Sequence, residues 1–175
     1  MHLANDALKS EDKFGSKEIT NPKNIFLEYI SANPTGPFHI GHVRGAVYGD
    51  TLARVARHID IGVHTEYYIN DAGNQIDLLG TSITLRAREI IFNETVEYPE
   101  KYYRGEYIDE LAHAAYQKFG KDIFEPNHNL ELAEFGKDIA LNIIKKDLAD
   151  AGIFIESWAS EKSYYDKPDQ TLQRL

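Results

Sequence analysis

The stretch "EYISANPTGPFHIGH", residues 28–42, decides the fold because it joins the end of a strand to the start of a helix. The segment "NIFLEYIS" at 24–31 is short, apolar and rich in β-formers, and it predicts a first strand. Pro34 and Pro37 then restrict the backbone of the exit, and a helical pattern begins at His39. We therefore expect a strand, a stiff turn and a helix in direct succession.

The helix predicted over 39–58 carries small and apolar side chains at helical spacing and ends in basic residues, which suit the negative end of its dipole. Gly41, Gly45 and Gly49 recur every fourth residue. Glycine in a helix interior costs about 1 kcal/mol relative to alanine. We expect close packing of the helix on the sheet at Gly45 and Gly49, and a ligand close to the backbone at Gly41.

A second strand, predicted over 63–69, is followed at once by a helical pattern. Strand and helix alternating in this way predict parallel βαβ units and an α/β fold. From about residue 80 the sequence is mainly helical, including the tyrosine-rich "YPEKYYRGEYI" at 98–108. Gly152 ends the last long helix, and "IFIESWAS" at 153–160 predicts a strand that returns to the sheet.

The composition is that of a folded, acidic chain of 175 residues, long enough for one domain or a domain core with one insertion. Apolar residues make up 42% and charged residues 27%. The formal net charge of −9 repels polyanions and membrane surfaces, so any nucleic-acid contact would be local. The sequence has no cysteine for disulfides and no targeting or membrane-spanning pattern. We expect a cytoplasmic protein.

Two polar clusters follow the two predicted strands. Ser31 and Asn33 leave the first strand, and Asn70, Asp71 and Gln75 leave the second. Ligands of open parallel sheets bind beyond the carboxyl ends of the strands, so these side chains are candidates for one substrate rim. The alternative is that each of them is a helix cap or an Asx-turn.

His39 and His42 are three residues apart in a first helical turn, so both imidazoles project from one face at the positive end of the helix dipole. Such a pair can donate hydrogen bonds to phosphate oxygens as charge develops during phosphoryl or nucleotidyl transfer. Gly41 between them leaves room for a base or a ribose. Metal binding is the weaker interpretation, because no third ligand has local spacing, and we expect no metal site.

Three further features have two interpretations each. Glu28, inside the first strand, either faces outward or receives a cationic group at the rim. Arg44 either meets phosphate or lies on a solvated helix face, which we favour. The tyrosines of 98–108 could stack on nucleic acid, but their acidic neighbours favour packing of an inserted subdomain. Trp158 is expected in the core.

Four blocks of the sequence carry a family resemblance. "SANPTGPFHIGH" at 31–42 closely resembles the HIGH signature of class I aminoacyl-tRNA synthetases, in the extended form typical of arginyl-tRNA synthetases. "EYYINDAGNQIDLLGTS" at 66–82 is similar to the next block of that family. "YRGEYI" at 103–108 and "DLADAGIFIESWASE" at 147–161 look like its later landmarks. The resemblance runs from about residue 24 to 161.

The resemblance implies an incomplete Rossmann-like parallel sheet of the class I synthetase (HUP) type, with an inserted, mainly helical subdomain. Residues 1–23 would be an N-terminal tail or linker, and 24–79 the first half of the catalytic domain. Residues 80–140 would form the insertion, and 141–175 the return helix and strand.

The resemblance also implies ATP-dependent activation of L-arginine to arginyl-adenylate and its transfer to tRNA(Arg), with Mg²⁺ accompanying ATP. His39 and His42 would stabilise the α-phosphate. Glu28 would pair with the guanidinium of arginine, and Asn33 with Ser31 would hold its backbone. The residues implied in ATP binding are His39, Gly41, His42, Pro34, Thr35 and Gly36.

Parts of the family pattern are missing from this sequence. It has no second signature of the KMSK type, no later tyrosine and acid to complete the arginine pocket, and no helical anticodon-binding domain. We therefore expect the isolated chain to be a monomer that binds nucleotide weakly at best and does not aminoacylate. Arginine-dependent pyrophosphate exchange by the isolated chain would contradict this.

Two rival functions stay open. One is a stand-alone H-x-G-H nucleotidyltransferase, and the other is a non-catalytic module that binds a partner through an exposed sheet edge. Thermal stabilisation by ATP alone would favour the first, and stabilisation by neither ATP nor arginine the second. Stabilisation by arginine together with ATP would favour the synthetase.

Overall fold

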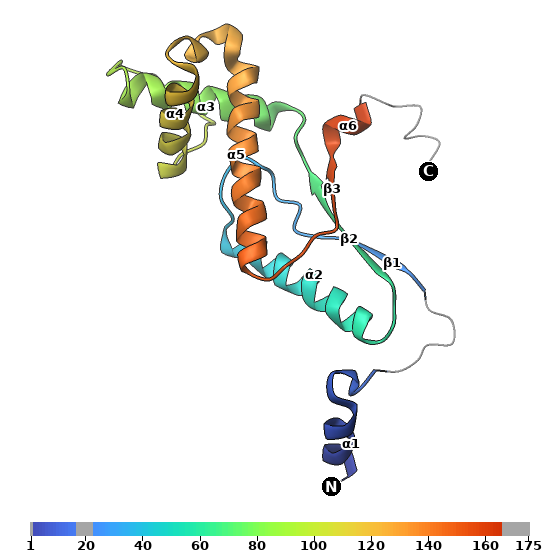
Figure 1. Ribbon diagram of the computed structural model, residues 1–175. Helices are drawn as coiled ribbons and strands as arrows, with labels where there is room; N and C mark the ends of the chain where they lie inside the picture. Colours follow the sequence, from blue (N-terminus) through green and yellow to red (C-terminus); the bar gives the residue numbers. More distant parts are fainter. Residues whose placement is uncertain (1, 17–22, 166–175) are drawn as a thin grey trace.

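The computed structural model describes residues 2–16 and 23–165, and its centre is a parallel sheet of three strands in the order β1-β2-β3 (Figure 1). The strands are β1 (Ile25–Glu28), β2 (Val63–Ile69) and β3 (Ser157–Ser160). Ile25 pairs with Val63, so β1 and β2 start in register and their carboxyl ends leave the sheet at the same edge. The predicted α/β class with a parallel sheet is confirmed.

Two of the predicted strands are shorter than expected. The first, predicted over 24–31, ends at Glu28 because Ile30 and Ser31 have φ values of 73° and 41°, a left-handed conformation that breaks the ladder. The third, predicted over 153–160, forms a ladder only from Ser157 onward. The second strand has the predicted bounds.

The long helices lie to one side of the sheet and extend beyond one of its ends (Figure 1). The long helices are α2 (Ile40–His58), α3 (Asn74–Ile90), α4 (Glu106–Phe119) and α5 (Asn129–Asp150). The short ones are α1 (His2–Ser10), η1 (Glu11–Lys13), η2 (Asp122–Phe124), η3 (Pro126–His128) and α6 (Glu161–Tyr165). The expected tail contains α1, which has no buried residue, and its residues 17–22 lie outside the described part of the chain.

The tyrosine-rich segment was expected to be mainly helical, and most of it is not. Residues 93–105 form no helix, and α4 begins only at Glu106, after Gly105 with φ of 128°. The positive φ of Gly105 turns the chain directly before the first helical residue. Tyr107 therefore lies in the first turn of α4.

Two hydrophobic clusters make up the core. One lies among α3, α4, η2 and the first part of α5, and the other lies between the sheet, α2 and the last part of α5. On α5, Ile139 packs on the first cluster and Leu141 on the second. This border falls next to the predicted end of the insertion, but α3 and α5 continue without a break through residues 79–80 and 140–141. The domain division therefore stays a prediction.

The glycines of α2 differ in their surroundings. A Cβ atom at Gly49 would overlap with the ring of Tyr29, so the close packing expected there is confirmed. The same expectation is wrong for Gly45, which is exposed and has no atom within 4 Å of the place of a Cβ. The buried side of α2 consists of Ala46, Gly49, Ala53 and Ala56. Small residues there let the helix lie close to the strands.

Candidate functional site

His39 caps the first turn of α2 through its side chain. Its extended backbone precedes the helix, and its Nδ1 accepts a hydrogen bond from the backbone N–H of Gly41 at 3.1 Å. In return, the backbone N–H of His39 donates to Nδ1 of His42 at 3.4 Å. This reciprocal cap satisfies donors that a helix start leaves without partners.

The two imidazoles stack on each other, with ring centroids 3.6 Å apart and an interplanar angle of 21°. Both Nδ1 atoms accept hydrogen bonds, so in the neutral rings the proton belongs on Nε2. Each ring therefore has one N–H donor left for a ligand. Two such donors at the positive end of a helix dipole suit an anion, as the sequence predicted.

The pKa of His42 lies below its usual value of 6.5. Burial is the larger cause, because it disfavours the charged ring, and the charge of His39 beside it lowers the pKa further. His42 is therefore neutral near pH 7 and donates from Nε2 without carrying a charge of its own.

Asn33 and Gln75 bring the two strand exits together. The side-chain amide of Asn33 donates to Oε1 of Gln75 at 2.6 Å. Ala32, the residue before Asn33, accepts a hydrogen bond from the hydroxyl of Tyr67 in β2 at 2.8 Å. The predicted meeting of the two exits is confirmed for this pair.

A cleft of about 490 Å³ collects most of these groups. Its lining residues are Asn33, Thr35, Gly36, Pro37, His39, His42, Gln75, Tyr103 and Tyr107. The two tyrosines come from the segment before α4 and from its first turn, and neither of them was predicted from the sequence as a site residue. They lie within the "YRGEYI" block, so its family resemblance was the signal that could have identified them.

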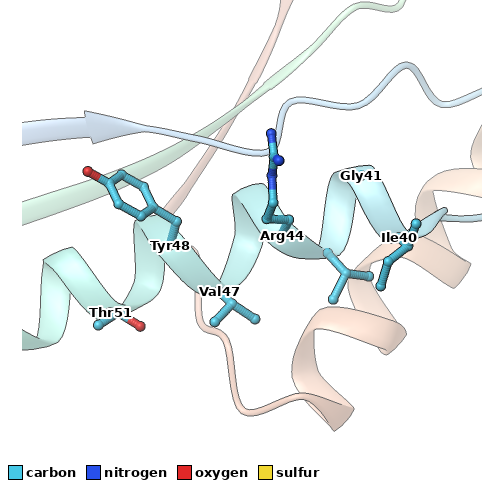
Figure 2. Close-up of a pocket in the computed structure, with 7 residues that line it drawn as sticks. Ile40, Gly41, Arg44, Val47, Tyr48 and Thr51 are labelled. Carbon is cyan, nitrogen blue, oxygen red and sulfur yellow. The ribbon is translucent and has the colours of Figure 1, made fainter.

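A second, more open hollow runs along α2 from its first turn (Figure 2). It has a volume of about 840 Å³ and is lined by Ile40, Gly41, Val43, Arg44, Val47, Tyr48 and Thr51. Ile40 is 83% exposed and Tyr48 is 73% exposed, so this apolar side of the helix is open. Gly41 and the exposed Arg44 both line it, and a Cβ atom at Gly41 would lie 3.0 Å from the ring of His39, so the expected approach of a ligand to Gly41 stays a prediction.

Glu28 and Ser31 lie outside the cleft and are linked to each other. The hydroxyl of Ser31 donates to Oε1 of Glu28 and accepts from the backbone N–H of Tyr68 at 3.0 Å. Glu28 is exposed at the end of β1, so its carboxylate is accessible from solvent and both of its interpretations stay predictions. The Ser31 contact holds its carboxylate beside the exit of the strand.

Asp71 and Pro34 are buried within the protein. The Oδ2 of Asp71 accepts from the hydroxyl of Ser160 at 2.7 Å and its Oδ1 from the backbone N–H of Lys162 at 3.0 Å. Only 8% of Asp71 is exposed, and Pro34 is fully buried. Asn70, also predicted for the rim, does not line the cleft. The structure therefore brings Gln75, but not Asn70 or Asp71, to the histidines.

Other expected side chains have structural roles. Trp158 is partly buried and stacks on Tyr67 with centroids 4.5 Å apart. Tyr98 and Tyr102 stack on each other at 4.4 Å.

Among the described residues, no group of three or more histidine or acidic side chains is placed to hold a metal ion, and no helix is long and apolar enough to cross a membrane.

Comparison with known proteins gives consistent results. A protein of Campylobacter fetus named arginine–tRNA ligase is 70% identical over 174 residues, covering 99% of this chain and 33% of the relative. One of Campylobacter curvus with the same name is 63% identical over 174 residues, again 99% of this chain and 33% of the relative. The chain thus spans about a third of the length of these curated relatives.

A solved structure from Campylobacter jejuni, provisionally named an arginyl-tRNA synthetase, superposes with a TM-score of 0.87 at 53% identity. It covers 98% of this chain, which corresponds to 38% of the other. These relatives favour the synthetase over a stand-alone nucleotidyltransferase and a non-catalytic module.

The family described as tRNA synthetases class I (R), catalytic domain, matches residues 3–119. The match includes both strand exits, the histidine pair and the tyrosines of the cleft. The family implies the use of ATP. Because the match covers well over half of the sequence, this chain belongs to the class I tRNA synthetases (R) through their catalytic domain.

Proposed function

We propose that this chain supplies the part of an arginine–tRNA ligase active site that binds the phosphates of ATP and the main-chain end of L-arginine. One observation carries the proposal. His39 and His42 are stacked at the start of α2 in one cleft with Asn33 and Gln75, and among the described residues neither Nε2 has a hydrogen-bond partner. This arrangement fits a ligand that has an anionic group for the two histidines and, next to it, polar groups for the side-chain amides of Asn33 and Gln75.

In the proposed reaction, the carboxylate of arginine attacks the α-phosphorus of ATP. A carboxyl–phosphate anhydride forms and pyrophosphate leaves, so negative charge accumulates on the α-phosphate oxygens in the transition state. The Nε2–H groups of His39 and His42 donate to those oxygens, and the α2 dipole favours the same charge. Both donors are held in place by the helix cap before the substrate arrives.

For arginine, we propose that Asn33 contacts the main-chain amino or carboxylate group and that Glu28 receives the guanidinium. The hydrogen bond from Ser31 holds the carboxylate of Glu28 at the strand exit. An arginine side chain matches a carboxylate in a bidentate, charge-assisted manner. Asn70 and Asp71 remain proposed neighbours of this rim.

For ATP, we propose that the adenosine lies over Gly41, at the end of the open hollow along α2 (Figure 2). Pro34, Thr35 and Gly36 shape the turn below the phosphates. Mg²⁺ would enter with the phosphates. The arginyl group would then pass to the acceptor end of tRNA(Arg) in the full-length enzyme. We further propose that the protein is monomeric and cytoplasmic.

The test uses a chimera in which this chain replaces the matching third of the Campylobacter fetus relative. The assay measures arginine-dependent exchange of pyrophosphate into ATP, and we expect the chimera to catalyse this exchange. His42→Ala should reduce kcat by about 10²- to 10³-fold, the usual cost of one oxyanion donor. Glu28→Gln should raise KM for arginine more than KM for ATP.

His58→Ala is the matched control, because His58 is on the same helix but at its other end, outside the cleft. It should leave kcat unchanged. A folded chimera without exchange, or one in which His42→Ala and His58→Ala have equal effects, would refute the proposed function.

A further inference from the structure

Tyr107 touches the turn that leads to the two histidines. A Cβ atom built on Gly36 would lie 3.0 Å from Cζ of Tyr107 and 3.2 Å from its Cε2 and Oη. Distances of 3.0–3.2 Å are tighter than most real Cβ contacts, so the phenol end of the ring lies against the glycine backbone. Residues from the insertion and from the first strand exit meet at this point.

The ring of Tyr107 is attached to a well-anchored helix. Arg86 of α3 donates to both carboxylate oxygens of Asp109 in α4, at 2.6 Å and 2.7 Å. The hydroxyl of Ser82 accepts from the backbone N–H of Tyr103 at 2.9 Å, and Ile108 is fully buried in the helical cluster. The first turn of α4 therefore has little freedom to move.

The part of the turn next to Tyr107 has few backbone hydrogen bonds, although Pro37 fixes one of its torsion angles. Within the described part of the chain, the backbone N–H groups of Gly36 and Phe38 donate no hydrogen bond to another residue. Contacts made by side chains therefore have a large share in setting the position of Gly36 and Pro37. Burial raises the pKa of Tyr107 to about 12, so its ring is uncharged at neutral pH.

Tyr107 is also shared by two cavities. It lines the cleft of about 490 Å³ that contains His39 and His42. It also lines a second cavity of about 800 Å³ between the same turn and helices α4 and α5. The second cavity leaves open space behind the turn, so without this ring Gly36 and Pro37 would have room to shift away from the histidines.

We propose that Tyr107 is a positioning residue, whose ring holds the Gly36–Pro37 turn and thereby the orientation of His39 and His42 toward the phosphate. The proposal rests on the proposed function above for its catalytic consequence. In this proposal the first turn of α4 supports the start of α2, in addition to packing in the helical cluster.

The activity test uses the chimera with the Campylobacter fetus relative and compares kcat with KM for ATP. Tyr107→Ala should lower kcat by about 10- to 100-fold, because small displacements of reacting groups have effects of this size, while KM for ATP changes much less. Tyr107→Phe, which keeps the ring, should restore most of kcat. Tyr116→Ala is the matched control, because Tyr116 is a tyrosine of the same helix that lines neither cavity.

A substitution on the other side of the contact tests the same idea independently. Gly36→Ala should lower kcat, because its methyl group crowds the ring of Tyr107 and either the ring or the turn must shift. Combined with Tyr107→Ala, which removes the obstacle, Gly36→Ala should cause no further loss. A strictly additive double variant would overturn the proposal.

A structural measurement on the 175-residue chain separates this proposal from the proposed function. The imidazole NMR signals of His39 and His42 should shift in Tyr107→Ala and stay in place in Tyr107→Phe and Tyr116→Ala. If the unsubstituted chimera is inactive, the proposed function fails, and these signals still decide the role of Tyr107. The positioning role of Tyr107 is overturned if the histidine signals do not move in folded Tyr107→Ala, or if the kcat of the Tyr107→Ala chimera equals that of the Tyr116→Ala chimera.

Discussion

Asn33 donates a hydrogen bond to Gln75 at 2.6 Å, which joins residues 42 positions apart in the sequence. Asn33 follows β1 and Gln75 lies in the first turn of α3, after β2. Both side chains line the cleft that contains the histidine pair. The contact thus connects the exit of β1 with the start of α3 after β2, at the edge of the sheet where ligands of parallel sheets bind.

This contact predicts energetic coupling between the two amides. In the chimera, Asn33→Ala and Gln75→Ala should each lower kcat/KM for arginine, and the double variant should lose less than the sum of the two. We expect a coupling of about 0.5 to 3 kcal/mol, the range for residues in direct contact. Gln117→Ala, an exposed amide on α4, should combine additively with Asn33→Ala. Additivity of Asn33 and Gln75 would show that the contact has no effect on the site.

The two glycines of α2 should respond to alanine in opposite directions. Gly49→Ala places a methyl group on the ring of Tyr29 and should lower the free energy of unfolding by about 1–3 kcal/mol, as overpacking does. Gly45→Ala enters open space and should raise it by about 1 kcal/mol, the gain in helix propensity. Urea denaturation of both variants checks this pair. Equal effects would mean that α2 does not lie on Tyr29 as described.

The lowered pKa of His42 predicts a pH dependence of stability. Its folded-state pKa is below 6.5, mainly through burial, so near that pH the unfolded chain binds more protons than the folded one. The stability that depends on neutral His42 is complete above 6.5 and is lost as the pH falls through 6.5 to the folded pKa.

An NMR titration of the 175-residue chain measures this directly. The His42 signal, assigned by its disappearance in His42→Asn, should have a midpoint below 6.5. The stability difference between the unsubstituted chain and His42→Asn should shrink with acidification. A midpoint at or above 6.5 would mean that the ring is more hydrated than the structure shows.

Asp71 should matter for folding. Asp71→Ala leaves the hydroxyl of Ser160 and the backbone N–H of Lys162 without their acceptor, so unfolding should become easier by about 1–3 kcal/mol. Asp77→Ala, at an exposed position in the first turn of α3, should cost less, about 0.3–1 kcal/mol through the helix dipole. If Asp71→Ala abolished exchange in the chimera without changing stability, its role would be at the substrate rim.

The parts of this site that the sequence predicted are local. The order of strand, turn and helix and a helix start within one residue of Ile40 involve neighbouring positions, whereas the cap by His39 was not predicted. Backbone restrictions and helical periodicity act over that range, so the sequence predicts this order and this helix start. β2 was predicted with its observed bounds for the same reason.

The tertiary structure decided what depends on packing between elements. Tyr107 meets Gly36 across 71 positions of sequence, Asp71 is tied to Ser160 across 89, and Gly49 but not Gly45 faces Tyr29. No local pattern distinguishes such partners, because they are set by how helices and strands fill the space between them. The amino-acid sequence by itself thus determined the strand, turn and helix that carry the histidines and the family they resemble. Only the folded chain determined which distant side chains close the cleft around them.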